Sequence, residues 1–229
     1  MSRFLTVCSA RFELSVKQPP FAEEAQRDCV VFFGGTDADY PMNGIPQRRK
    51  AERHWLGVWR DERDVDRFFS SPTTHLPQLA GAHDVRGLKL IPYMRRGTEI
   101  FALDVHHTRP MPEEPVAIIT SIGYYASESD VMAAGQKASA ARESLAQADG
   151  LIHELLLIPH PPMATDFFTI TVWRNERAAQ AWAYRSEAHR QAMEFYKTAS
   201  EKPRVSFTRC LIGGSFGDWQ KSGLSSVDG

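Results

Sequence analysis

Several short stretches of the chain alternate hydrophobic with polar or small residues, and each such stretch predicts a β-strand. The clearest runs from residue 167 to Trp173 and is rich in β-branched residues. An alanine-rich segment follows, and Asn175 is well suited to cap a helix there. At helical spacing, one face of this predicted helix carries Trp182, Ser186, His189 and Met193. A histidine on the inward stripe of a helix is therefore the first candidate for function.

This strand–helix pattern occurs twice in the chain. The sequence VWRDER at residues 58–63 returns as VWRNER at residues 172–177, identical except for an Asp/Asn exchange. The offset is 173 − 59 = 114, and the histidines that follow, His75 and His189, keep it without a gap. We infer an internal duplication of about half the chain, which predicts two related domains, residues 1–112 and 113–229.

The second half predicts the order β-α-β-β-α-β, which is the split βαβ or ferredoxin-like order. Its predicted strands are 116–124, 151–158, 167–173 and 204–212, and its helices are 127–148, with Gly150 at the C′ position, and the segment after Asn175. The first half predicts strands at 4–12, 29–33, 53–59 and 87–92, a helix at 61–69, a vestigial first helix at 22–27, a long loop at 36–50 and a connector at 95–112. One such half leaves a sheet face bare, and two halves can cover each other. We therefore expect an α+β protein whose tandem ferredoxin-like repeats form an intrachain dimeric α+β barrel.

Composition narrows the class of protein. The 229 residues are 42% hydrophobic and carry a formal net charge of −1, with no basic block, so we expect no nucleic-acid partner. We expect no membrane span and no signal peptide, because no apolar run is long enough. The three cysteines are widely spaced, which favours reduced thiols in a cytoplasmic protein.

The segment TVWRNERAAQAWAYRSEAHRQAM, residues 171–193, is similar to the second half of the spheroidene monooxygenase family of carotenoid-modifying heme proteins. Residues 114–120 and 205–209, and the sequence Gly217-Asp218-Trp219, also resemble that family. The resemblance covers about residues 113–220, and in the first half only residues 55–69. The loop before residue 55 departs from the family pattern, so the resemblance does not extend to the substrate.

Wider relatives of that family are dimeric α+β barrels, several of which bind heme through a histidine in the second helix of the repeat. The resemblance therefore implies a heme b site with His189 as the axial iron ligand. The residues implied at that site are Trp173, Trp182, Arg185 and Met193 for cofactor binding, and His189, Ser186 and Arg209 for catalysis. Arg185 and Arg209 would pair with the heme propionates.

Each of these residues also has an ordinary structural interpretation. The tryptophans are suited to a packed core, the arginines to the surface, and His189 to a partly buried, hydrogen-bonded position. His75 follows a proline break, so its geometry should differ from that of His189. His153 lies in an apolar strand, where it faces either a cavity or the core. His106 and His107 lie in the proline-rich connector and are interpreted as solvated loop residues, and three tyrosines stay unranked as hydrogen-bond donors to a bound oxygen or substrate: Tyr124, Tyr125 and Tyr184.

We expect a heme-dependent, monooxygenase-like oxidoreductase that acts on a small or hydrophobic substrate, with a homodimer possible. Dehydration or rearrangement on the same heme is an open variant, since a fold does not determine its chemistry. Two rival hypotheses are a cofactor-free monooxygenase of the antibiotic-biosynthesis type and a non-catalytic heme carrier.

Overall fold

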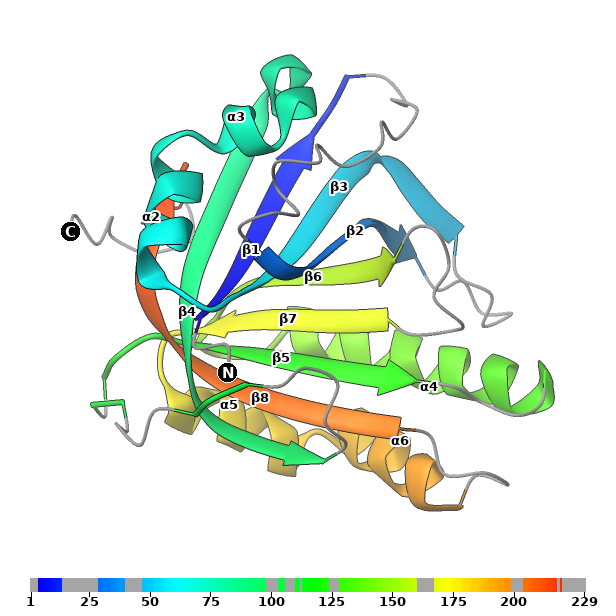
Figure 1. The fold of residues 1–229 in the computed structure, drawn as a ribbon. Coiled ribbons are helices and arrows are strands. Elements are labelled where there is room, and N and C mark those ends of the chain that lie inside the picture. The colour runs from blue at the N-terminus through cyan, green and yellow to red at the C-terminus, as the bar shows by residue number, and fades with distance from the viewer. Residues whose placement is uncertain are drawn as a thin grey trace.

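Eight antiparallel strands close into one barrel in the computed structural model (Figure 1). The structure describes residues 4–13, 29–39, 47–97, 103–105, 110–111, 113–123, 128–159, 167–198, 204–217 and 219. The strands are β1 (Phe4–Arg11), β2 (Cys29–Asp39), β3 (Gln47–Trp59), β4 (Asp84–Gly97), β5 (Val116–Gly123), β6 (Leu151–Pro159), β7 (Phe167–Trp173) and β8 (Arg204–Phe216). The helices are α2 (Glu62–Ser70), α3 (Pro72–His75), the 3₁₀ turn η1 (Pro77–Gly81), α4 (Glu128–Ala146), α5 (Glu176–Arg185) and α6 (Glu187–Thr198).

The strand order around the barrel is β1-β3-β2-β6-β7-β5-β8-β4. Each half of the chain contributes four adjacent strands in the same relative order, β4-β1-β3-β2 and β8-β5-β7-β6, as expected for tandem ferredoxin-like repeats. The halves join along a long β4–β8 ladder and along a short β2–β6 contact of two residue pairs. The predicted fold class, an α+β protein with an intrachain dimeric α+β barrel, is therefore confirmed. The boundary between residues 112 and 113 stays a prediction.

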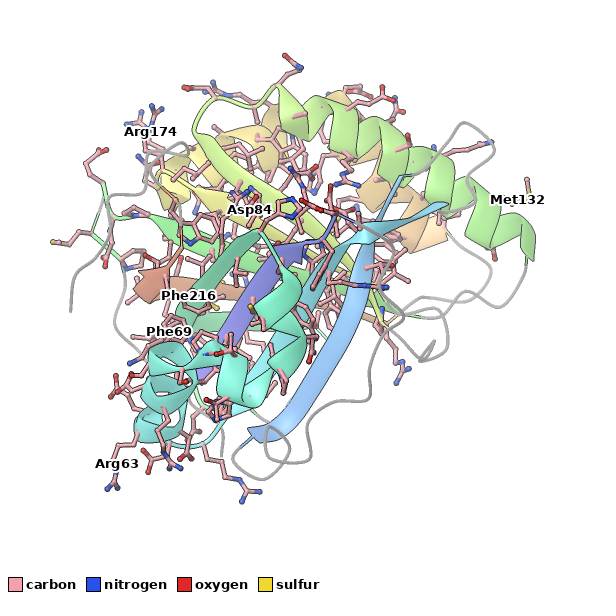
Figure 2. The ribbon with its side chains drawn as sticks, turned by 90° about the horizontal axis from the view of Figure 1, so that it is seen from above. Arg63, Phe69, Asp84, Met132, Arg174 and Phe216 are labelled. Atoms are coloured by element: carbon pink, nitrogen blue, oxygen red, sulfur yellow. The ribbon has the colours of Figure 1, made fainter. Side chains whose placement is uncertain are left out.

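The side chains alternate between the barrel interior and the helix-covered outer faces. Inward positions such as Leu56, Val58, Ile119 and Ile170 form one buried cluster, which Trp219 joins. On the first half, a second cluster packs outward beneath α2, α3 and η1; Figure 2 shows Phe69 of α2 beside Phe216 at the end of β8, with ring centroids 5.0 Å apart. The helices α4, α5 and α6 cover the outer face of the second half (Figure 1). None of the helices in the described residues is long and apolar enough to cross a membrane.

The predicted loop at residues 36–50 is wrong at both of its ends. Strand β2 continues to Asp39 and β3 begins at Gln47, so of the predicted loop only residues 40–46 lie outside the described structure. The two strands pair Asp37 with Arg49 after a register shift. Opposite charges on neighbouring strands stabilise such a polar ladder, which hydrophobic alternation does not reveal.

The last strand of the first half is also longer than predicted. Strand β4 runs from Asp84 to Gly97 and passes through Pro92, where a register shift against β8 interrupts the ladder. Proline is tolerated at such an irregularity because no regular ladder hydrogen bond is lost. Gly150 lies in the turn before β6 with φ +81°, four residues beyond the end of α4, and so is not the C′ residue.

Candidate functional site

The single helix predicted after Asn175 is wrong, because the structure divides it at Ser186. Helix α5 starts where Asn175 Oδ1 accepts the N–H of Ala178 at 2.9 Å. Ser186 caps the end of α5 in an extended conformation, and its Oγ accepts the N–H of His189 at 3.1 Å. A serine hydroxyl that takes a backbone N–H competes with helical hydrogen bonding and starts a new helix. His189 therefore lies in the first turn of α6.

One nitrogen of the His189 ring is hydrogen-bonded, and the other makes no hydrogen bond in the described residues. Nδ1 lies 2.8 Å from the backbone oxygen of Ala183, and because a carbonyl only accepts, Nδ1 carries the proton. Nε2 makes no hydrogen bond within the described residues and is not among their fully buried polar atoms. Burial lowers the pKa of His189, with the bond to Ala183 opposing it in part, so the ring stays neutral. The result is an imidazole with its Nε2 lone pair free for a ligand.

Aromatic rings and serine hydroxyls hold this imidazole in place. Its ring lies on Trp182 with centroids 4.6 Å apart, and Trp182 lies on Trp173 at 5.8 Å. Ser144 of α4 accepts the indole N–H of Trp182 at 3.3 Å and bonds to Ser186 Oγ at 2.7 Å. The contact with the Trp182 ring and the bond to the Ala183 carbonyl restrict rotation of the imidazole, which suits a metal ligand.

The sheet beneath α6 is less tightly covered than the equivalent face of the first half. Barrel register places Thr169 on β7 where the first half has Trp55 on β3. Trp55 is only 3% exposed, whereas Thr169 is partly exposed despite lying between two strands under the helix layer. The second half therefore has a threonine at the position where the first half packs an indole beneath its helices.

Apolar side chains line the region between α6 and the sheet. Ile122 and Ala134 form a small cluster with four partly buried neighbours: Phe167, Phe195, Tyr196 and Val205. His189, Ala192 and Tyr196 follow at i, i+3 and i+7 on one face of α6. This face of α6 packs towards the sheet. The Nε2 atom of His189 and the apolar side chains of this cluster therefore lie in the same layer between α6 and the sheet. An imidazole with one unbonded nitrogen beside apolar side chains is donor chemistry that suits a flat apolar cofactor.

The other predicted site residues are not all gathered around His189. Trp173 is 1% exposed and belongs to the core, while Met193 is 42% exposed. Arg185 is exposed at the end of α5. Arg209 forms an ion pair with Glu176 at the start of α5. Heme binding by these residues stays a prediction.

The remaining candidates are placed as follows. His75, the repeat partner of His189, is buried at the end of the one-turn helix α3 against the edge of Phe68. His153 faces the barrel interior, edge-on to Trp219 at 5.3 Å. Four of the candidate residues lie outside the described structure: His106, His107, Tyr124 and Tyr125.

A buried polar cluster at one end of the barrel follows no local sequence pattern. Arg142 of α4 reaches Asp37 of β2 at 3.2 Å and Glu154 of β6 at 2.7 Å, which links the two halves. His54 Nδ1 lies 3.0 Å from the Oγ of Ser9. Burial opposes ionisation of Asp37, yet His54 and Arg142 together keep the pKa of this carboxyl below its usual value.

Ligand atoms of Asp37, Glu52 and His54 lie within 4.8 Å of one another, a spacing that a divalent cation could bridge. Arg142 pairs with Asp37, and Arg11 pairs with Glu52 at 3.4 Å, so both carboxylates have a cationic partner without a metal. Sequence reasoning missed it because Asp37 lay in the segment taken for a loop.

No family model matches the sequence, and no curated protein matches it. Among solved structures, an aldoxime dehydratase in complex with butyraldoxime superposes with a TM-score of 0.58 at 11% identity, covering 91% of this chain and 79% of that one. A heme-degrading enzyme from Listeria monocytogenes (TM-score 0.35, 9% identity, 90% and 98% covered) and a monooxygenase-like protein from Listeria innocua (0.33, 9%, 91% and 94%) are also similar. At 11% identity, the likeness to the aldoxime dehydratase shows a shared α+β barrel fold and no more.

Proposed function

We propose that this protein is a heme-dependent oxidoreductase in which His189 is the axial iron ligand. The observation that carries the proposal is the fixed tautomer of His189. Its Nδ1 donates to the Ala183 carbonyl at 2.8 Å while Nε2 stays without a hydrogen bond in the described residues. Metal-bound histidines commonly donate their second nitrogen to a carbonyl in this way, which fixes the ring and raises its basicity.

The space for the cofactor would come from the layer between α6 and the sheet. Thr169 replaces the indole that Trp55 supplies in the first half, and the surrounding residues are apolar. Trp182 and Ser186 would position the imidazole, with Trp173 supporting Trp182 from below. Arg185 and Met193, at exposed positions, would contact the cofactor edge.

Bound heme would supply an iron centre that activates oxygen or peroxide, or that binds a substrate nitrogen or oxygen as a Lewis acid. The protein's own contribution is to hold a neutral imidazole in one orientation and to keep water from the apolar layer. We propose monooxygenation of a small hydrophobic substrate. Dehydration of an aldoxime to a nitrile and water is the second candidate, because the barrel superposes on an aldoxime dehydratase.

The test compares His189→Ala with His75→Ala, since the two histidines are repeat partners. The full chain is produced with a heme precursor, and its absorption spectrum is recorded. We expect a Soret band in the wild type and in His75→Ala, a much weaker band in His189→Ala, and partial recovery of that band with added imidazole. The absence of heme from the wild type would contradict the proposal and favour a cofactor-free barrel. A Soret band that is identical in all three proteins would exclude His189 as the ligand.

Turnover then separates an enzyme from a heme carrier. The heme-loaded wild type is incubated with peroxide and a hydrophobic substrate, and separately with butyraldoxime under reducing conditions. Oxygenated product supports the monooxygenase, and butyronitrile supports the dehydratase. Neither product, with heme bound, would indicate a carrier.

A further inference from the structure

The groups that orient the His189 ring belong to a different helix from the one that carries it. The imidazole is in the first turn of α6, whereas both of these groups are in the last turn of α5. Its Nδ1 donates to the Ala183 carbonyl at 2.8 Å, and its ring lies on Trp182 with centroids 4.6 Å apart. The two helices meet at Ser186, which has an extended backbone. The direction of the Nε2 atom therefore depends on the angle between α5 and α6.

Ser144 of α4 is hydrogen-bonded on both sides of this junction. Its Oγ accepts the indole N–H of Trp182 in α5 at 3.3 Å and lies 2.7 Å from the Oγ of Ser186. Ser186 in turn accepts the backbone N–H of His189 at 3.1 Å and so caps α6. A single hydroxyl from α4 therefore links the end of α5 to the start of α6. Hydrogen bonds joined in this way act together, so the loss of one member weakens the others.

The first half of the chain has the same junction without these hydrogen bonds. The equivalents, 114 positions earlier, of the three second-half residues at the junction are Phe68, Pro72 and His75. Phenylalanine has no N–H and proline has no hydroxyl, and no helix is described between β1 and β2. Here proline interrupts the helix, and His75 meets Phe68 edge-on at 74°. The ring orientation thus differs between the halves together with the hydrogen bonding at the junction.

We propose that Ser144 is a positioning residue for His189. By linking Trp182 to the cap of α6, its hydroxyl sets the angle at which the Nδ1–H of His189 meets the Ala183 carbonyl. This bond keeps Nε2 unprotonated and turned in one direction. The consequence at iron rests on the function proposed above, because a firm hydrogen bond at Nδ1 makes the imidazole a stronger donor to a metal. The contacts themselves need no heme, so the role of Ser144 can be tested separately.

The test follows the His189 ring by NMR in the full chain without heme, with ¹⁵N-labelled histidine and with His189→Ala to assign the signals. In the wild type we expect the Nδ1–H tautomer and an Nδ1 proton that is protected from exchange with water. Ser144→Ala should make that proton exchange at least about fivefold faster, as expected for the loss of one typical hydrogen bond. The share of the Nε2–H tautomer should rise with it.

Trp182→Phe tests the same link from its other end. It removes the indole N–H and keeps an aromatic ring, as the first half does with Phe68. We expect faster exchange of the His189 Nδ1 proton here too. Because both substitutions remove the same hydrogen bond, the double variant should exchange no faster than Ser144→Ala alone.

Glu143→Ala is the matched control, because it truncates an exposed side chain on the same helix as Ser144. It should keep the exchange rate and the tautomer of the wild type. Unchanged exchange in Ser144→Ala, an equal effect of Glu143→Ala, or effects that multiply in the double variant would each overturn the proposal. Ser144→Ala is expected to fold, because alanine is a better helix former than serine.

The heme-loaded proteins separate this role from the proposed function. Ser144→Ala should keep the Soret band, since His189 is still present, but its heme should have a higher reduction potential than that of the wild type. The reason is that an imidazole held less firmly at Nδ1 donates less to iron. If the wild type binds no heme, the proposed function fails, whereas the NMR comparison still decides the role of Ser144.

Discussion

Phe68 and Trp182, 114 positions apart in the sequence, occupy equivalent places in the two halves of the barrel. Phe68 lies against Trp59 with ring centroids 5.5 Å apart and an interplanar angle of 37°; Trp182 lies against Trp173 at 5.8 Å and 36°. The duplicated sequence therefore produced a duplicated ring pair, in which a strand-end tryptophan supports the aromatic ring of the following helix.

The two halves diverge at the histidine that follows each pair. His75 meets Phe68 edge-on, at 74°, whereas His189 lies tilted over Trp182 at 48° and 4.6 Å. The Nδ1 atom of His75 is 3.4 Å from the carbonyl of Ser71, a longer contact than the 2.8 Å of His189. Only His189 combines a short bond at one nitrogen with a less filled layer beside it, so His75 is an internal control for its role.

The Ser186 hydroxyl should matter for both stability and ring position. We expect Ser186→Ala to destabilise the protein by about 1 kcal/mol, because α6 loses its N-cap. In a chain of this size that corresponds to a melting temperature lower by about 2–4 °C, measurable by circular dichroism. The control is Ser70→Ala, whose hydroxyl bonds to a backbone carbonyl within α2 and caps nothing. Equal melting temperatures for Ser186→Ala and the wild type would contradict the capping role.

Gly35 should be essential to the contact between the halves at β2 and β6. A Cβ placed on Gly35 would lie 2.3 Å from the backbone oxygen of Ile158, and Gly35–Pro159 is one of the two β2–β6 residue pairs among the described residues. Because the obstacle is backbone, it cannot move aside without opening the ladder. We expect Gly35→Ala to cost about 1–3 kcal/mol in urea denaturation.

Gly81→Ala is the matched control for that substitution. A Cβ on Gly81 meets nothing within 4 Å, so the free energy of unfolding should change by less than about 0.5 kcal/mol. If both alanine variants unfold at the same urea concentration, the β2–β6 contact contributes little to the barrel.

His153 should make the protein less stable in mild acid. Burial, helped by the positive Arg86 and by His54, lowers the pKa of His153 from 6.5 to about 4. Between these values the unfolded chain binds a proton that the folded protein does not. Stability from this residue is therefore complete above pH 6.5 and falls as the pH drops towards 4, by at most about 3 kcal/mol.

His153→Phe keeps an aromatic ring next to Trp219 and removes the titration. We expect its free energy of unfolding to fall less steeply than that of the wild type between pH 6.5 and 4. Proton NMR of the wild type should place the His153 titration near pH 4. A normal titration near 6.5, or parallel pH profiles for the two proteins, would show that His153 is not held neutral by burial.

The sequence alone determined the duplication, the fold class and most strands of the second half. These depend on local features: alternation of side chains along a strand, an asparagine that caps α5, and a repeat offset that aligns Trp59 with Trp173 and His75 with His189. Such features act between residues that are close in the chain, so they can be read without coordinates. Even the candidate ligand, His189, came from its helical spacing and from family resemblance.

The tertiary structure decided how distant residues meet. It placed Ser186 against Ser144 of α4, which favours a break in a segment whose composition predicts one helix. It brought Asp37, Arg142 and Glu154 together from two halves. No local pattern encodes these contacts, because their free energy depends on barrel closure and on burial, which bring together residues far apart in the chain.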